Sequence, residues 1–224
     1  WYNNDATGTT YEVEDIPKDL LDEANEWRAK LIESVANVDD TLLARFLEDH
    51  DSITGDEIVT ALRKSTILGL AIPVICGSAF KNKGIQNLLD AAIEFLPSPV
   101  DIGAVTGIDP RNDNEIKREP DDNEPLAALA FKIATDPFVG RLVFLRIYSG
   151  VLHAGDTVLN TRTGKRDRVN RLFQMHANKQ NPEESVSAGD ICAGVGFKDL
   201  RTGDTLCAIN KPITLESMDF PEPV

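Results

Sequence analysis

A charged segment with almost no apolar residues, 109–125 (DPRNDNEIKREPDDNEP), divides the chain into two parts of different character. Before it, apolar residues recur at the three- and four-residue spacing of amphipathic helices. After it, they come in short runs bounded by Gly, Asp and Asn, which is typical of strands. A chain of 224 residues is long enough for two domains. We therefore predict a mainly helical part, a linker and an all-β part.

Residues 17–69 are expected to form three helices. The first begins near Pro17, the second spans Thr41–Glu48, and the third has a clear start at Thr54. Thr54 and Glu57 have the spacing of a capping box, and Gly69 suits a helix end. The apolar residues with helical spacing in the first helix predict its buried face: Leu20, Ala24, Trp27, Leu31 and Val35.

A strand, a short loop and a helix are expected to follow. The apolar run near Ala71–Cys76 predicts a buried strand, GSAFKNKG (77–84) the loop, and the stretch from Ile85 a helix that ends before Pro97. Such a loop lies at the carboxyl end of a strand, where α/β proteins often bind ligands. From the residues alone, a simple turn between strand and helix is the stronger interpretation of GSAFKNKG.

The runs after residue 125 predict a small antiparallel barrel. Gly-Asp precedes three of them, at Gly155, Gly189 and Gly203, and this pair favours a turn that leads into a strand. The segment MDFPEPV at the end of the chain is interpreted as a connector.

Charge is distributed unevenly along the chain. The net charge is −14, yet residues 1–60 carry 16 acidic and 4 basic residues, whereas residues 125–210 carry 8 acidic and 11 basic ones. The acidic part should avoid nucleic acid, and the second part could meet it. No apolar run approaches the roughly 20 residues of a membrane helix. The cysteines Cys76, Cys192 and Cys207 lie in apolar runs without paired spacing, so we expect buried, reduced thiols and no metal site.

Longer motifs carry a family resemblance. EDIPKDLLDEANEWR, CGSAFKNKGIQNLLDAAIEFLPSPVD, ALAFKIATDPFVGRLVFLRIYSGVL, GDTVLN, QMHAN, TGDTLC and FPEPV occur in the order found in bacterial-type translation elongation factor G. The chain resembles an internal piece of that family from end to end.

The resemblance implies an architecture. Residues 1–70 would form most of the helical subdomain inserted in a GTPase domain, and residues 71–97 the last strand, loop and helix of that P-loop fold. Residues 98–124 would be a linker, residues 125–210 a β-barrel of the domain II type of translation factors, and residues 211–224 a connector.

The resemblance also implies a function for a longer parent protein. That parent would be a monomeric, cytoplasmic GTPase that promotes ribosomal translocation and binds GTP or GDP with Mg²⁺. This chain contains neither a G-x-x-x-x-G-K-[ST] loop nor Asn-Lys-x-Asp, so we expect both to lie upstream of Trp1. We therefore expect no hydrolysis and no tight nucleotide binding by this chain alone. The alternatives are a paralogous recycling or ribosome-protection factor, and a stand-alone ribosome-interaction module.

Within the family resemblance, Ser78, Ala79 and Phe80 match a loop that supports the guanine base. A backbone N–H near Ala79 would donate to guanine O6, where adenine presents a donor of its own, and such a site rejects the wrong base strongly. Two charged surfaces are the other candidates. The acidic residues Asp19, Asp22, Glu23 and Glu26 would meet the basic ribosomal stalk protein, or they form a merely solvated helix face.

The basic residues of the barrel would contact ribosomal RNA of the small subunit, or they serve solubility alone. They are densest in RTGKRDRVNR: Arg162, Lys165, Arg166, Arg168 and Arg171.

Overall fold

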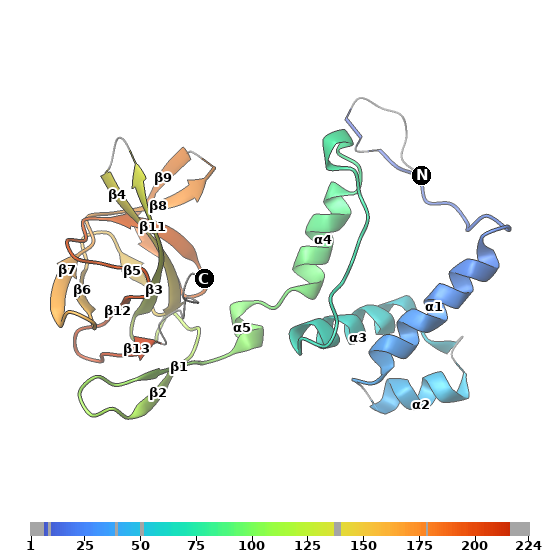
Figure 1. Ribbon diagram of the computed structural model, residues 1–224, viewed down its shortest axis with the longest axis horizontal. Helices are drawn as coiled ribbons and strands as arrows, with labels where there is room; N and C mark the ends of the chain where they lie inside the picture. The colour runs from blue at the N-terminus through green and yellow to red at the C-terminus, as the bar shows by residue number, and fades with distance from the viewer. Residues whose placement is uncertain are drawn as a thin grey trace, which may run out of the picture. The chain divides into compact units, whose positions relative to one another are not determined.

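The computed structural model describes residues 7–8, 10–38, 40–49, 52–136, 140–177 and 179–215. Most of the connector expected at residues 211–224 lies outside these ranges. The chain divides into two compact units, Trp1–Pro97 and Ser98–Val224 (Figure 1). We call them the N-terminal and the C-terminal unit.

The N-terminal unit contains three helices around a small core. They are α1 (Leu21–Ala36), α2 (Asp40–Glu48) and α3 (Gly55–Ile67). The predicted capping box starts α3: the Thr54 hydroxyl accepts a hydrogen bond from the Glu57 N–H, and the Thr54 N–H donates to the Glu57 carboxylate at 2.8 Å. Gly69, with φ +71°, follows the end of α3 as expected. The core consists of Ile32, Val35, Ala36, Leu42, Ile53, Ile58 and Ala61.

The predicted buried face of α1 is largely wrong. Val35 is buried, but Leu20, Trp27 and Leu31 are 48%, 61% and 42% exposed. The helix instead packs through a stripe about a quarter-turn away that contains Ile32 and Ala36. The reason is that α2 and α3 contact the second half of α1, so that only this half loses its water. Helical spacing alone does not say where the neighbouring helices lie.

The run that follows α3 is extended but forms no strand. Residues 71–77 have no ladder partner among the described residues, and Ile72 and Val74 are 87% and 86% exposed. The prediction of a buried strand there is therefore wrong, and so is that of a buried Cys76. A strand needs a neighbour for its N–H and C=O groups. The short 3₁₀ helix η2 (Ala79–Lys81) and α4 (Ile85–Phe95) follow.

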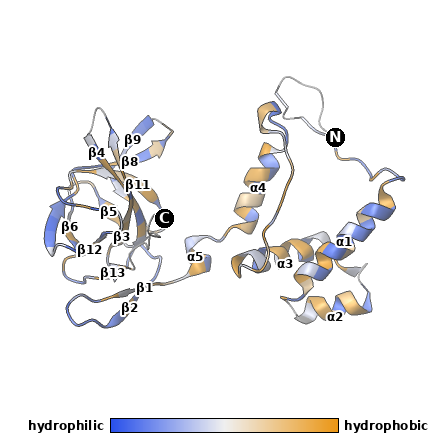
Figure 2. Ribbon diagram, viewed as in Figure 1, coloured by the Kyte–Doolittle hydropathy of each residue, from blue (hydrophilic) through white to orange (hydrophobic). Residues whose placement is uncertain are grey.

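The apolar residues of α4 and its end are mostly exposed as well. Only Phe95 is buried, whereas Leu88, Leu89 and Leu96 are about half exposed. Arg63 of α3 donates a hydrogen bond of 2.6 Å to the Glu94 carbonyl and ties the two helices together. Figure 2 shows apolar residues along α4 and along the extended chain before it.

The C-terminal unit is an antiparallel β structure preceded by the short helix α5 (Pro99–Ile102). Eight strands form one curved sheet in the order β7-β6-β12-β3-β4-β11-β8-β9, a second sheet has the order β13-β1-β2, and β5 pairs with β10. The strands are β1 (Val105–Ile108), β2 (Glu115–Arg118), β3 (Ala127–Asp136), β4 (Gly140–Ser149), β5 (Leu152–His153), β6 (Thr157–Asn160), β7 (Lys165–Arg168), β8 (Arg171–His176), β9 (Lys179–Glu183), β10 (Ser185–Val186), β11 (Ile191–Val195), β12 (Thr205–Cys207) and β13 (Thr214–Leu215).

The curved sheet encloses a core made by alternate residues of its strands. Val143, Leu145 and Ile147 of β4 point inward and are fully buried together with Leu172 and Leu206. This is the period-two pattern of a strand with one face in a core. Cys192 belongs to this core and Cys207 to a second cluster, as expected, and burial raises the pKa of the Cys192 thiol to about 12.

The three predicted Gly-Asp turns are confirmed. Gly155, Gly189 and Gly203 have φ values of +95°, +94° and +93°, and β6, β11 and β12 begin two residues after them. This region of backbone conformation favours glycine, because a Cβ atom is strained there. The Gly-Asp dipeptide thus forms the same kind of turn three times, each time just before a strand.

The charged segment interpreted as a linker is structured. It contains β2, which pairs with β1, and β1 in turn pairs with β13. Val105 and Ile116 of this small sheet pack against a cluster that contains Leu129 and Cys207 of the large sheet and Leu215 of β13. Apolar contacts and the pairing of β1 with β13 hold the hairpin, and polar residues of its turn bond locally. The Asp109–Arg111 pair is an example, with a 2.6 Å contact that helps lower the pKa of Asp109 to about 2.

Candidate functional site

The loop predicted to support guanine is closed by its own backbone. The Ser78 N–H donates to the Lys83 carbonyl at 2.8 Å, and the Lys83 N–H donates back to the Ser78 carbonyl at 3.0 Å. Asn82 and Gly84 adopt left-handed conformations with φ of +55° and +78°, which lets the chain turn from η2 into α4. The result is a tight loop in which the small residue Ala79 directly follows the closing pair.

The three predicted loop residues present different groups. Ser78 is partly buried, whereas Ala79 and Phe80 are exposed. Within the described residues, the N–H groups of Ala79 and Phe80, at the start of η2, donate no hydrogen bond. Unpaired N–H groups at such a position can donate to an acceptor atom on a ligand. The loop therefore has the donors that recognition of a guanine O6 requires.

A contact that the sequence does not predict joins this loop to the start of the chain. The Asn82 side-chain amide donates to the Thr7 carbonyl at 2.9 Å. A Cβ atom on Gly8 would lie only 2.0 Å from the Lys81 carbonyl oxygen, so the approach requires glycine. The two segments are 75 residues apart in sequence, and no local pattern could reveal their proximity.

The four predicted acidic residues lie at and near the start of α1, and all are exposed or partly exposed. We call them the acidic face: Asp19, Asp22, Glu23 and Glu26. Glu26 pairs with Lys30 at 2.5 Å, which lowers the pKa of Glu26, and the Lys30 ammonium also lies 4.4 Å from the centre of the Trp27 ring. Asp19, Asp22 and Glu23 form no ion pair with another described residue, so most of the negative charge faces solvent.

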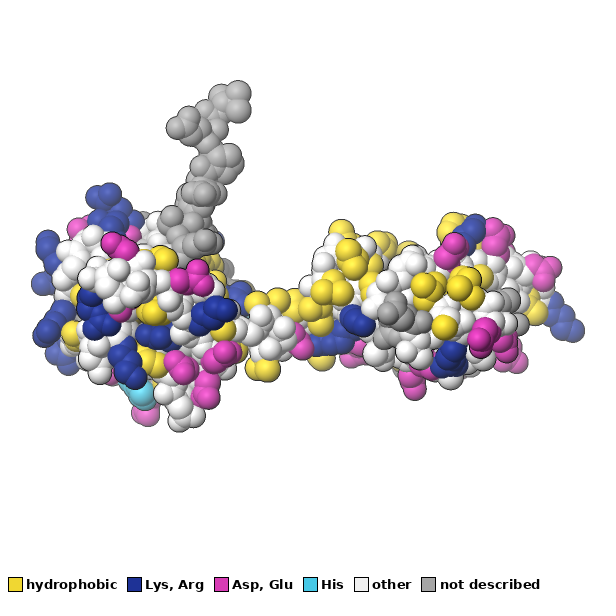
Figure 3. Space-filling view, turned by 90° about the horizontal axis from the view of Figure 1, so that it is seen from below, with side chains coloured by type: hydrophobic (Ala, Val, Ile, Leu, Met, Phe, Trp, Pro, Cys, Tyr) yellow, Lys and Arg dark blue, Asp and Glu magenta, His cyan; other side chains and the backbone are white. Residues whose placement is uncertain are grey.

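The five predicted basic residues divide into two groups. Lys165, Arg166 and Arg168 lie on the edge strand β7 and Arg171 on β8, and all four are exposed. We call these four the basic edge. Figure 3 shows Lys and Arg side chains gathered on one flank of this unit, at the left of the view. Between the arginines of β7, Asp167 points inward and is buried, which keeps its charge away from that surface.

Arg162, the fifth, has a structural role. Its guanidinium holds the buried Asp204 through Nε at 2.6 Å and Nη2 at 3.0 Å, and also contacts the Asp199 carbonyl. Burial alone would raise the pKa of Asp204, but hydrogen bonds from Arg162, the Arg201 N–H and Asn160 lower it on balance. We call this set of contacts the Asp204 network. It joins the turn before β7 to the turn before β12 and leaves Arg162 with little capacity for another anion.

No helix among the described residues has the length and apolar character needed to cross a membrane. Within the same residues, no group of three or more His, Cys, Asp or Glu side chains is placed to hold a metal ion.

Two comparisons with known proteins bear on the units. Residues 140–207 match the family of elongation factor Tu domain 2. A crystal structure of a protein from Thermus thermophilus matches 94% of this chain with a TM-score of 0.69 and 26% sequence identity. The chain covers 29% of that protein. Together the matches support the class of translational GTPases and the barrel type of the C-terminal unit.

Proposed function

We propose that this chain is part of a translation elongation factor of the G type, a GTPase that promotes ribosomal translocation. The observation that carries the proposal is the elongation factor Tu domain 2 match over the barrel. The likeness to a longer solved protein, which extends over 94% of the chain, supports the same parent for both units. Recycling and ribosome-protection factors, and a stand-alone ribosome-interaction module, are the alternatives.

In this proposal, residues 71–97 complete a GTPase domain whose other strands come from the longer protein, and residues 1–70 form its inserted subdomain. The exposed apolar side chains support this assignment. Ile72, Val74 and Ile93 are each at least 80% exposed. Side chains of this kind in a continuous stretch usually mark a surface that another element covers.

The guanine-supporting loop would read the base of GTP or GDP in the longer protein, where Mg²⁺ accompanies the phosphates. Replacement of Ala79 by Phe should then weaken GDP binding by the longer protein at least tenfold, because the larger side chain blocks the approach of the base. The chain of 224 residues alone should not bind GDP more tightly than about 10 μM in calorimetry. Tight binding by this chain would contradict the proposed division of the pocket.

The acidic face would meet the basic stalk protein of the large ribosomal subunit. Opposite charges raise the rate of encounter and make it sensitive to salt. Charge reversal in Asp22→Lys with Glu26→Lys should abolish most of the stalk-dependent stimulation of GTPase activity and leave the unstimulated activity intact. Glu48→Lys on α2 is the matched control. Equal stimulation in all three proteins would refute the assignment.

The basic edge would contact phosphates of small-subunit ribosomal RNA, which position a protein without reading sequence. Arg166→Gln with Arg168→Gln should lower the slope of log affinity against log salt by roughly one for each phosphate that the protein no longer neutralises. A slope equal to that of the unaltered protein would show that these arginines contact no phosphate and serve solubility alone.

Translocation and recycling are different reactions of the ribosome, so they can be assayed separately with the longer protein. A translocation assay on purified ribosomes, run beside a subunit-splitting assay, separates them. Activity in splitting alone would favour the recycling paralogue over the proposed function.

A further inference from the structure

A cavity of about 530 Å³ lies in the C-terminal unit, between the small sheet and the outer face of β4. Its walls come from segments distant in sequence: the run from α5 to β1, the residue Pro120 after β2, β3, β4, the turn before β11, and β13. Most of the lining is apolar, including Pro99, Val105, Leu129, Tyr148 and Leu215. The volume is in the range of sites that enclose one small molecule or one side group of a polymer.

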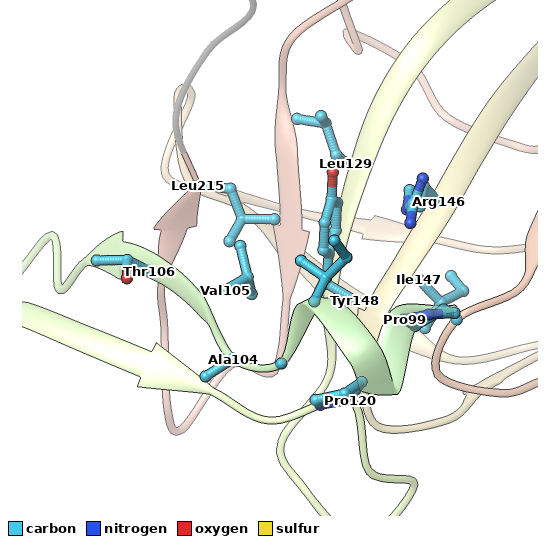
Figure 4. A pocket seen from close by; sticks show the side chains of 13 residues that line it. Pro99, Ala104, Val105, Thr106, Pro120, Leu129, Arg146, Ile147, Tyr148 and Leu215 are labelled. Atoms are coloured by element: carbon cyan, nitrogen blue, oxygen red, sulfur yellow. The ribbon is translucent and has the colours of Figure 1, made fainter. Parts of the chain in front are cut away.

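One cation stands in this apolar lining. Arg146 and Tyr148 project from the same face of β4, and the guanidinium lies 5.3 Å from the centre of the Tyr148 ring (Figure 4). Opposite Arg146 in the sheet are Leu129 of β3 and Ile191 of β11, which are both apolar. Among the described residues, no carboxylate forms an ion pair with Arg146. The cavity therefore combines a positive charge with flat, apolar surfaces.

This combination favours a ligand that is both planar and anionic. A base can stack on a tyrosine ring or on a guanidinium plane, and the phosphate beside it can accept hydrogen bonds from the arginine. An apolar side chain from a protein partner would fill the walls but cover the half-buried charge of Arg146 without supplying an anion, which is costly. A duplex cannot offer a single base to a cavity of this size, since its bases are stacked and paired.

We propose that this cavity takes one unstacked base of single-stranded RNA, with the adjacent phosphate on Arg146. The proposal rests on the RNA contact of the proposed function and goes beyond it. The basic edge would bind phosphates of the RNA backbone whatever the state of the bases. The cavity would bind only a base that is not stacked on its neighbours.

The test compares two fluorescent probes in anisotropy titrations with the full chain. One is a five-nucleotide oligouridine, and the other is a ribose-phosphate oligomer of the same length without bases. The unaltered protein should bind the oligouridine roughly tenfold more tightly, as expected for one stacked base. Arg146→Gln should remove that preference, and Arg146→Lys, which keeps the charge but not the plane, should remove part of it. Lys132→Gln is the matched control, because Lys132 also lies over a ring on this face, that of Phe144, outside the cavity.

The possible outcomes separate this inference from the proposed function. Equal affinity of the unaltered protein for both probes would overturn the base site. If Arg166→Gln with Arg168→Gln still lowers the salt slope for both probes, the proposed RNA contact stands without it. A photo-crosslinker in place of Thr106, which lines the cavity, gives a second readout on ribosomes. Crosslinks to RNA are expected, and crosslinks to ribosomal protein alone would overturn the base site in favour of a protein partner. Thermal unfolding checks that each variant is folded.

Discussion

The two units differ in how completely they bury their apolar residues. In the C-terminal unit, β4 alone contributes three fully buried side chains, Val143, Leu145 and Ile147. In the N-terminal unit, the three helices share a small core, but Ile72, Val74 and most of the apolar face of α4 are exposed. Paired strands satisfy each other's backbone N–H and C=O groups within the barrel. A single extended segment needs partner strands from another part of the protein. The difference predicts which unit is stable by itself.

The largest expected effect is in the barrel core. Leu145→Ala should destabilise the C-terminal unit by about 2–5 kcal/mol, because it leaves a cavity in a closed core. Val74→Ala in the N-terminal unit should change stability by no more than about 0.5 kcal/mol, since the side chain is already in water. Unfolding in urea, with the hydrogen exchange of barrel amides as the readout, measures the stability of the barrel. Both tryptophans, Trp1 and Trp27, lie in the N-terminal unit, so fluorescence reports on that unit.

A large loss of stability in Val74→Ala would show that the exposed segment is packed in solution. The two units would then differ less in how completely they bury their apolar residues.

The Asp204 network gives the second effect. Asp204→Ala should destabilise the barrel by about 2 kcal/mol, because Arg162 loses its charged partner while Asn160 loses an acceptor. Hydrogen exchange of the turns before β7 and β12 measures it. Arg166→Gln, one of the exposed arginines of β7, is the control and should have almost no effect on stability. Equal effects of the two changes would mean that the network contributes little.

Stability should also depend on pH through this network. The folded pKa of Asp204 is below its ordinary value, so its ionised form stabilises the fold above about pH 4. That stabilisation is lost as the pH falls through the folded pKa. Asp204→Asn should therefore flatten the acid side of the barrel's stability profile, as measured by unfolding between about pH 6 and pH 2. A profile unchanged by the substitution would contradict the assigned pKa direction.

A smaller loss than in the barrel is expected at the start of α3. Thr54→Ala should cost about 1 kcal/mol, since the helix loses its side-chain cap. Only the N-terminal unit should respond, and tryptophan fluorescence measures it. Hydrogen bonds from Thr54 and Arg45 lower the pKa of Glu57 to about 2, so this unit should also lose stability as the pH falls below about 4. Thr60→Ala, within the same helix, is the control.

Much of the local structure was predictable from the sequence because its causes are local. The capping box at Thr54 and the Gly-Asp turns depend on residues at most a few positions apart, and both were predicted. The acidic face and the basic edge were also predicted as charged surfaces, although their partners stay predictions. The guanine-supporting loop was predicted from a motif, and its closed geometry is compatible with that role.

Other features were out of reach for a physical reason. Arg162 looked like its basic neighbours, and only the fold brings Asp204, 42 residues away, to its side chain. Strand β2 was hidden in a charged segment, because Ile116 is its only strongly apolar residue and its pairing with β1 is seen only in the fold. The position of Arg146 in a cavity depends on several segments that are distant in sequence, and no pattern in any one of them indicates it.

The sequence by itself determined where α3 begins and where the three Gly-Asp turns lie, because these follow from backbone preference within one short segment. The tertiary structure alone decided which apolar faces are covered, which arginines are paired and where a cavity remains. Burial and ion pairing depend on what lies opposite in space. In this chain the deciding neighbours are tens of residues away or, for the segment before α4, not among the described residues.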